Sequence, residues 1–279
     1  MIGIELTKQV RRARGWVTLG AMLAIPVVLT LVIGTSRPAL SEPVGDFGSV
    51  VTDSTGLSLP LISLSVMLLF LFPLSVAIFA GEAVAGEAGW GSLRYLLVHP
   101  VARWRVLASK AAVAGGFSVA VVVLTVATAM VAGTLAFGWH PLSVIDLQHT
   151  TAFNVATATF SPLDAVLRIF LAAGFILCTL ASTFCFSLFL STLTSRSFSA
   201  VAGGVGLSLF SRALDNVPGL HSLGPWLPVT DAGTTVWTGF FTAPTQSGGV
   251  VHVLVVQGIY SAVFLVAAFY WFTRSDILT

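Results

Sequence analysis

Long apolar runs separated by short polar stretches dominate the chain. A helix needs about 20 mainly apolar residues to cross the hydrocarbon layer of a membrane. Six runs meet this length, and we predict spans at about 16–34, 57–80, 106–137, 167–190, 198–214 and 250–272. The pattern therefore predicts an all-α membrane protein with six transmembrane helices, in which residues 1–279 form a single transmembrane domain.

Residues 1–15, before the first apolar run, have the pattern of an amphipathic helix. On a helical wheel one side is apolar and the other side is basic, with Ile2, Leu6, Val10 and Ala13 opposite Lys8, Arg11, Arg12 and Arg14. Such a helix lies in the headgroup layer of an anionic leaflet. A secretory signal peptide is the alternative, since a basic start, an apolar run and Ala39-Leu40-Ser41 resemble its three regions. The apolar run is long for a signal peptide, which favours the interfacial helix.

Two of the predicted spans contain residues that disturb or tighten helix packing. Pro73 lies inside the second span and should kink it or leave a backbone carbonyl without its helical donor. In the fifth span Ala200, Gly204 and Ser208 recur every four residues, a spacing that lets helix backbones approach closely. This close approach occurs either within the chain or at a subunit interface along a transport path. Between the fifth and sixth spans, residues 215–248 predict two short re-entrant or extracellular helices near 220–228 and 231–241.

Composition and charge support a membrane protein and predict its orientation. The chain is 56% hydrophobic and only 9% charged, whereas soluble domains carry about 25% charged residues. Ten of the 13 cations fall on the side of the N-terminus: Lys8, Arg11, Arg12, Arg14, Arg94, Arg103, Arg105, Lys110, Arg196 and Arg274. Because cytoplasmic loops carry the excess of Lys and Arg, we expect both termini and residues 86–105 to face the cytoplasm, in the cytoplasmic membrane.

The sequence carries no pattern that we associate with nucleotide hydrolysis. Gly81 and Gly86 have the separation of a P-loop, but Glu87 and Ala88 replace the Lys and Ser/Thr that hold phosphate and magnesium. The five histidines are scattered, and the two cysteines, seven residues apart in one apolar run, are too far apart on a helix for a disulfide. We therefore expect no enzyme activity, metal or cofactor in this chain. ATP and magnesium would belong to a partner.

Two pairs of opposite charges mark the outer ends of spans. Arg168 follows Asp164 by four residues, and Asp215 follows Arg212 by three. Both separations suit pairing on one helix face. The pairs form either a solvated rim or a polar lining of an outer exit, so we consider Arg168 and Arg212 possible path-lining residues.

The segment 86–105 holds much of the chain's small stock of charge. A helix from about Glu87 to Val98 has two faces, with Glu87, Gly91, Arg94 and Val98 on one and Trp90, Leu93, Leu96 and Leu97 on the other. Pro100 ends this helix. We hypothesise that it is a cytosolic docking element that receives mechanical work from an ATP-hydrolysing partner. The alternatives are a solvated turn for the first face and packing on the chain's own spans for the second.

The same residues resemble a known family. The stretch GEAGWGSLRYLLVHPVARWRVLASK is similar to the segment between spans two and three of ABC-2 type permeases, with Ser92 in place of Thr and Ala102 in place of Ser. The matching residues are Glu87, Gly91, Leu93, Arg94, Leu96, Leu97, Pro100, Val101, Arg103 and Lys110. The resemblance is greatest to the small permeases grouped with multicopper-enzyme maturation and drug-export systems.

This resemblance implies a permease subunit of an ATP-binding cassette exporter. Two permease chains, identical or different, would pair, and each would dock on a cytosolic ATPase through Glu87, Trp90, Gly91, Leu93, Arg94 and Leu97. The path would lie between the chains along spans two and five, beside Pro73, Gly204 and Ser208. A six-span scaffold or assembly factor that transports nothing is the alternative.

Overall fold

The computed structural model describes most of the chain. The described residues are 2–11, 13–35, 55–89, 102–145, 157–215, 217, 221–228, 236–241 and 249–274. Six described helices are long and apolar enough to cross a membrane: α2 (Ala13–Thr35), α4 (Leu71–Gly89), α6 (Arg103–Phe137), α7 (Pro162–Leu193), α8 (Ser197–Asp215) and α10 (Val250–Arg274). The part of the chain that the structure describes is 89% helical, which confirms the all-α, six-span prediction.

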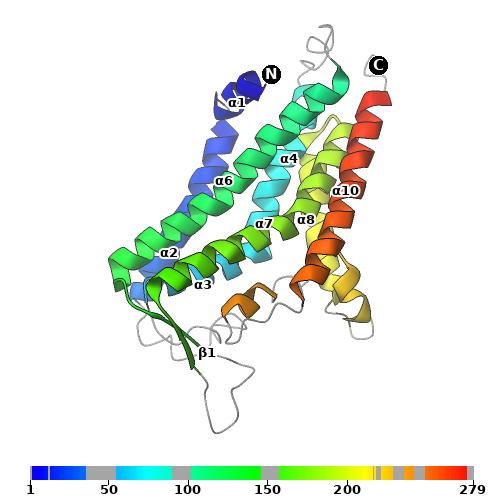
Figure 1. Cartoon of the computed structure of the whole chain (residues 1–279). Helices are drawn as coiled ribbons and strands as arrows, with labels where there is room; N and C mark the ends of the chain where they lie inside the picture. Colours follow the sequence, from blue (N-terminus) through cyan, green and yellow to red (C-terminus); the bar gives the residue numbers. More distant parts are fainter. Residues whose placement is uncertain are drawn as a thin grey trace.

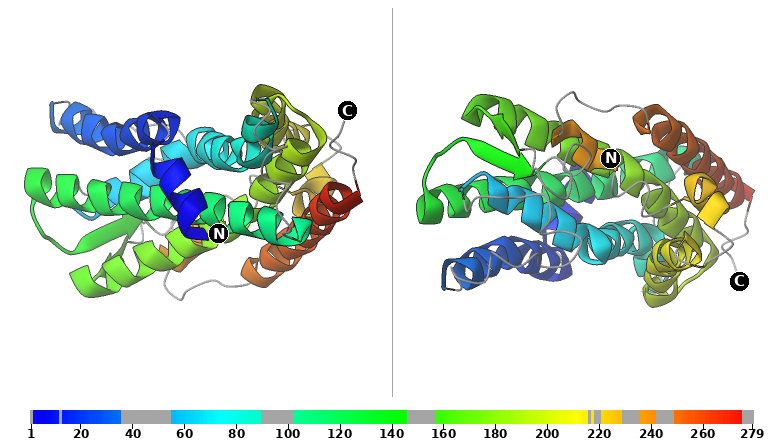
Figure 2. Two further views of the ribbon diagram at one scale, coloured as in Figure 1. Left: turned by 90° about the horizontal axis from the view of Figure 1, so that it is seen from above. Right: turned by 90° about the horizontal axis from the view of Figure 1, so that it is seen from below.

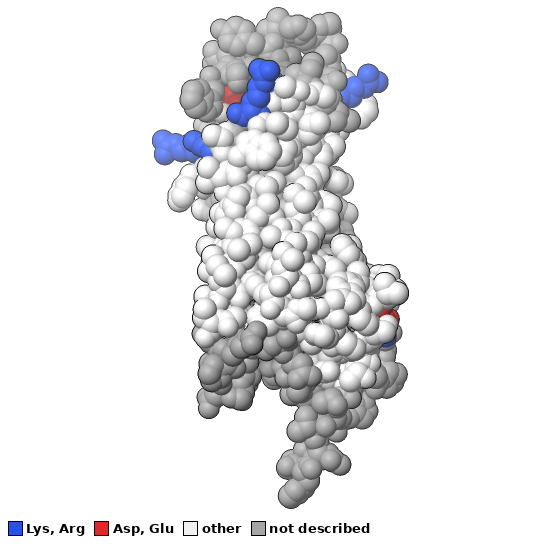
Figure 3. All heavy atoms as spheres, turned by 90° about the vertical axis from the view of Figure 1, so that its left-hand side faces the viewer, with Lys and Arg blue, Asp and Glu red and all other residues white. Residues whose placement is uncertain are grey.

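The two termini lie at the same end of the helical bundle (Figure 1), as an even number of spans requires. We call this the basic end, because exposed cations gather there: Arg11, Arg14, Arg105 and Arg274. The opposite end, which carries the strands β1 (Leu142–Ile145) and β2 (Thr157–Phe160), is the hairpin end. In the side view of Figure 3, blue Lys and Arg atoms cluster near one end above a wide band without charge. That band is the surface expected of a protein that faces lipid.

Helices α4 and α7 form the centre of the bundle. In the most apolar 18-residue stretch of each helix, 61% of α4 and 56% of α7 is buried inside the chain. The corresponding share is 17% for both α2 and α10. Helix α4 packs against α6, α7 and α8, and α7 also packs against α10. Views along the bundle show α2 and α10 near its opposite edges (Figure 2). A substitution in α4 is therefore expected to affect its packing against three other spans, α6, α7 and α8.

The predicted second span is divided in the structure. A short helix, α3 (Ser58–Leu69), has Phe70 as its C-cap, and α4 begins at Leu71. The proline ring of Pro73 removes one backbone donor and clashes with the carbonyl four residues earlier, that of Leu69. The predicted kink is therefore present as a break, and the second span consists of two helices. Helix α4 runs instead to Gly89, nine residues beyond the predicted end.

The connections at the hairpin end contain more structure than the sequence predicted. Strands β1 (Leu142–Ile145) and β2 (Thr157–Phe160) pair antiparallel, with Leu142 opposite Phe160, in a stretch predicted to be a loop. Leu142, Val144 and Phe160 join the apolar core, so burial of one side of the hairpin stabilises it. The two short helices predicted between the fifth and sixth spans are present as 3-10 turns, η3 (His221–Trp226) and η4 (Trp237–Phe241).

Candidate functional site

The structure describes both ends of the predicted docking segment. Glu87 lies in the last turn of α4, so the predicted helix of 87–98 does not begin as a separate element. Helix α6 begins at Arg103, three residues before the predicted third span. Residues 90–101 lie outside the described residues, and with them the predicted docking residues Trp90, Gly91, Leu93, Arg94 and Leu97.

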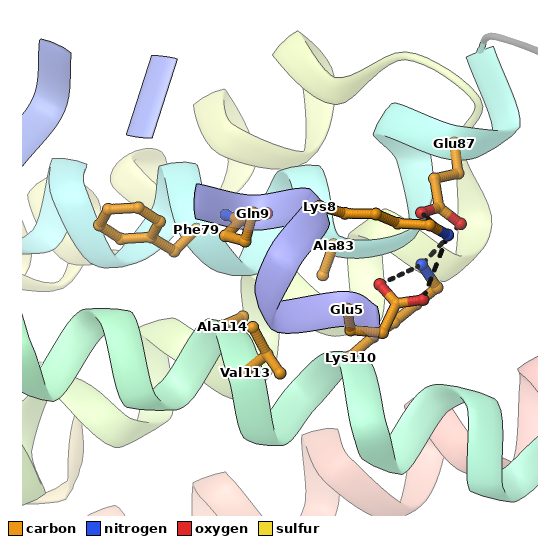
Figure 4. A pocket seen from close by; sticks show the side chains of 9 residues that line it. All are labelled: Glu5, Lys8, Gln9, Phe79, Ala83, Glu87, Lys110, Val113 and Ala114. Atoms are coloured by element: carbon orange, nitrogen blue, oxygen red, sulfur yellow. Dashed lines mark hydrogen bonds and ion pairs between the residues drawn. The ribbon is translucent and has the colours of Figure 1, made fainter. Parts of the chain in front are cut away.

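Four charged side chains from three helices meet beside these two ends. They are Glu5 and Lys8 of α1 (Ile2–Arg11), Glu87 of α4 and Lys110 of α6, and Figure 4 shows them pointing toward one another. The Nζ atom of Lys110 lies 2.6 Å from Glu87 Oε2 and 3.3 Å from Glu5 Oε2. The Nζ atom of Lys8 lies 3.4 Å from Glu87 Oε1 and 3.5 Å from Glu5 Oε1. We call these four residues the ion network.

The ion network is neutral and mostly shielded from solvent. The side chain of Lys110 is 2% exposed and that of Glu87 is 5% exposed, while Lys8 at the outer edge is 41% exposed. Buried charges need partners, because an unpaired one would lose its hydration without compensation. The Glu87 side chain therefore points into the chain, away from the outward face on which the sequence placed it with Arg94. A part for Glu87 in docking stays a prediction.

A serine of α7 holds the same part of α4 from the opposite side. The Ser191 hydroxyl donates to the carbonyl of Gly81 over 2.8 Å. It accepts from the amides of Val84 and Ala85 over 3.1 and 2.8 Å. One side chain thus bonds three backbone groups of a single helical region, two to six residues before Glu87. The last turns of α4 are consequently positioned by α1, α6 and α7 together.

Helix α1 has the amphipathic character that its sequence predicted. Leu6 and Val10 are 47% and 41% exposed, while Glu5 and Lys8 belong to the ion network. The apolar side chains on its outer side suit contact with lipid. Trp16, 59% exposed, donates its ring N–H to the carbonyl of Val10 over 2.6 Å, which ties the first span to α1.

A second cation is buried near the hairpin end. Arg212 of α8 is 6% exposed, and its guanidinium donates to the carbonyls of Leu68 and Leu69 over 2.8 and 3.1 Å. The carbonyl of Leu69 is the one that Pro73, itself buried in α4, cannot bond. The predicted free carbonyl thus exists, and an arginine from another helix satisfies it.

The small residues of the fifth span lie at a helix contact inside this chain. A Cβ on Gly204 would clash with the hydroxyl of Ser187 and approach Ala77 to 3.2 Å. The hydroxyl of Ser208, 1% exposed, lies 3.0 Å from that of Thr183. This placement agrees with the first of the two interpretations, packing within the chain. A path-lining role for Pro73, Gly204, Ser208 and Arg212 stays a prediction.

Arg168 joins three elements at the hairpin end. Its Nε atom lies 3.0 Å from Asp164 Oδ2, which confirms the predicted i,i+4 pair. Its guanidinium also stacks over the ring of Phe160 in β2 at 4.4 Å and donates to the carbonyl of Phe240 in η4. The arginine is thus part of the packing between α7, the hairpin and η4, and its predicted place at an outer exit is untested.

The sequence missed the ion network as a unit. Lys110 was predicted as one of the cytoplasmic cations and Lys8 as part of the basic side of the interfacial helix, and neither was paired with a carboxylate. The available signal was a lysine seven residues into α6, after which that helix carries no further charge. A charge at the edge of such a long apolar run requires a partner. In the described part of the chain no three His, Cys, Asp or Glu side chains gather as a metal site. The ion network instead holds α1, α4 and α6 together.

Comparison with known families identifies the group to which these features belong. A family model described as ABC-2 family transporter protein matches residues 1–194. The match extends from α1 to the end of α7 and includes the ion network and the segment between α4 and α6. No curated protein matches the chain. Since the matched region is more than half of the chain, the protein belongs to the ABC-2 family and is a multi-pass membrane permease component of an ABC transporter.

Proposed function

We propose that this permease is driven by a separate cytosolic ATPase that docks on the segment 87–98, and that the basic end faces the cytoplasm. The family assignment carries the proposal, because an ABC permease needs a nucleotide-hydrolysing partner and this sequence has no P-loop. ATP and Mg²⁺ are held by that partner. The excess of cations at the basic end supports the orientation in the cytoplasmic membrane.

The docking surface that we propose consists of the residues matched to the family pattern. Trp90, Leu93 and Leu97 supply apolar contact area, and Arg94 supplies a bidentate donor for a partner carboxylate. Glu87 acts from inside the chain by fixing the end of α4. Pairing of two permease chains and export as the direction of transport follow the resemblance to small ABC-2 exporters.

Site-specific cross-linking tests the docking proposal. A photo-reactive residue is introduced at Trp90 or Leu93, with Trp139 as the matched control, since Trp139 is a 50% exposed tryptophan at the hairpin end. We expect position 90 or 93, and not 139, to capture a protein that contains a P-loop and hydrolyses ATP. The double variant Glu87→Ala, Arg94→Ala should lower the co-purified ATPase at least tenfold, whereas Trp104→Ala should not.

Labelling of single cysteines tests the orientation. Cys178 and Cys185 are first replaced by alanine, and Trp90→Cys and Trp139→Cys are compared in intact cells with a membrane-impermeant maleimide. We expect label at position 139 and none at position 90 until the cells are opened. Label at position 90 in intact cells would place the segment outside and end the docking proposal.

A further inference from the structure

Lys110 is the point where three helices are joined. It belongs to α6 and contacts Glu5 of α1 at 3.3 Å and Glu87 of α4 at 2.6 Å. Glu87 lies two residues before the end of α4, and Lys110 lies seven residues after the start of α6. The pair therefore connects the two ends of residues 90–101 directly, and Glu5 adds the interfacial helix to the same connection.

The environment of Lys110 makes this connection hard to replace by solvent. The lysine and Glu87 are nearly excluded from water, and the cavity between α1, α4 and α6 that they line measures only about 10 Å³. That is room for at most one water molecule. If the ammonium is removed, water has little space in which to hydrate the carboxylates of Glu5 and Glu87.

The outer members of the ion network differ from Lys110 in reach. Lys8 belongs to α1, as Glu5 does, so its contacts with Glu87 join α1 to α4 but leave α6 aside. Glu5 joins α1 to α6 through Lys110. Lys110 is the one of these four residues that contacts carboxylates from two helices other than its own. Its loss should therefore loosen both connections at once, while loss of Glu5 should loosen only α1.

We propose that Lys110 is a positioning residue that makes the interfacial helix α1 and the two ends of residues 90–101 a single mechanical unit. A displacement that reaches the end of α4 or the start of α6 is then passed to α1, α4 and α6 together and not absorbed in a hinge at Glu87. The inference rests on the proposed function for the origin of the displacement. The connection itself is a property of this chain and is measured without a partner.

Amide hydrogen exchange of the full-length protein in lipid nanodiscs tests the connection. In Lys110→Met we expect exchange to accelerate at least tenfold in α1 and in the last turn of α4, with α10 unchanged. Lys110→Arg should keep the wild-type pattern, because the charge is retained. Arg14→Gln is the matched control, since it removes the exposed pair between Arg14 and Glu82, 3.0 Å apart, and should leave the last turn of α4 protected.

Glu5→Gln keeps the test decisive if Lys110→Met does not fold. This variant should accelerate exchange in α1 at least tenfold and leave the last turn of α4 within twofold of the wild type. A uniform acceleration over all helices, or no acceleration in α1 in either variant, would overturn the proposal. An absence of any ATPase partner would overturn the proposed function instead, and the exchange result would stand unaffected.

A distance measurement in the complex with its ATPase tests the mechanical consequence. Spin labels are placed at the exposed Thr7 of α1 and at Ser92, with Cys178 and Cys185 replaced. In the wild type we expect the distance between the labels to stay constant when ATP and vanadate are added, if the label at Ser92 reports the movement of the ends of α4 and α6. In Lys110→Met the distribution should broaden or shift on the same addition. A wild-type distance that changes with ATP would contradict a single unit.

Discussion

The two ends of the bundle each bury a cation, but they use it differently. At the basic end, Lys110 lies between carboxylates from two other helices. At the hairpin end, Arg212 bonds two adjacent carbonyls of the broken second span. The compact ammonium acts as a point charge among separate elements, whereas the planar guanidinium can bridge neighbouring oxygens with a fixed fork of donors. The cation at the basic end thus links three helices, and the cation at the hairpin end bonds the backbone at the break in the second span.

The largest loss of stability is expected when the buried cation at the basic end is removed. Lys110→Met leaves Lys8, which is 41% exposed, as the one cation of the ion network beside Glu5 and Glu87. Breaking a buried ion pair from one side costs about 3–5 kcal/mol. We expect the free energy of unfolding in detergent micelles to fall by about this amount. A loss below about 1 kcal/mol would show that the ion network is solvated in the folded protein.

Removal of the arginine at the hairpin end should have a smaller effect. Arg212→Leu leaves the carbonyls of Leu68 and Leu69 without these donors in apolar surroundings, at a cost of about 2–3 kcal/mol. Arg212→Lys should recover only part, because an ammonium on a flexible stem lacks the fork of donors. Unfolding of both variants in the same micelles measures the difference. Full recovery by lysine would show that charge alone matters at this end, as at the other.

A packing substitution provides a charge-free reference between these cases. Gly204→Ala puts a methyl group against Ser187, and overpacking of this kind costs about 1–3 kcal/mol. Gly206→Ala is the matched control two residues away, since nothing lies within 4 Å of its Cβ position. We expect the first to lower the unfolding temperature and the second to leave it unchanged or raise it. Equal effects would mean that α7 and α8 are not in close contact.

The smallest effect is expected for the exposed ion pair at the basic end. The Arg14 side chain is 71% exposed, and its pair with Glu82 is open to water. Exposed pairs contribute about 0–1 kcal/mol, so Arg14→Gln should change the free energy of unfolding by less than about 1 kcal/mol. Raising the salt concentration should weaken the wild-type contribution further. A large, salt-independent loss would show that Arg14 belongs with the buried ion network.

Local features of the fold were predictable because they depend on neighbouring residues. Apolar run length gave the six spans, and five of them have ends within five residues of those predicted. The proline effect at Pro73 acts over four residues, and the Asp164–Arg168 pair spans one helical turn. The hairpin was missed because its short alternating stretches, Leu142–Ile145 and Thr157–Phe160, are separated by 11 residues without a recognisable tight turn.

The sequence by itself determined the membrane class, the number of spans, the break near Pro73 and the family pattern around Glu87. These follow from hydrophobic transfer and backbone sterics, which act over a few residues. Only the tertiary structure decided which charges pair between different helices. Lys110 and Glu5 are 105 residues apart in the chain, and Arg212 and Leu68 are 144 apart. Contacts over such separations depend on how the helices pack in space, since every buried charge must find its partner on whichever helix lies beside it.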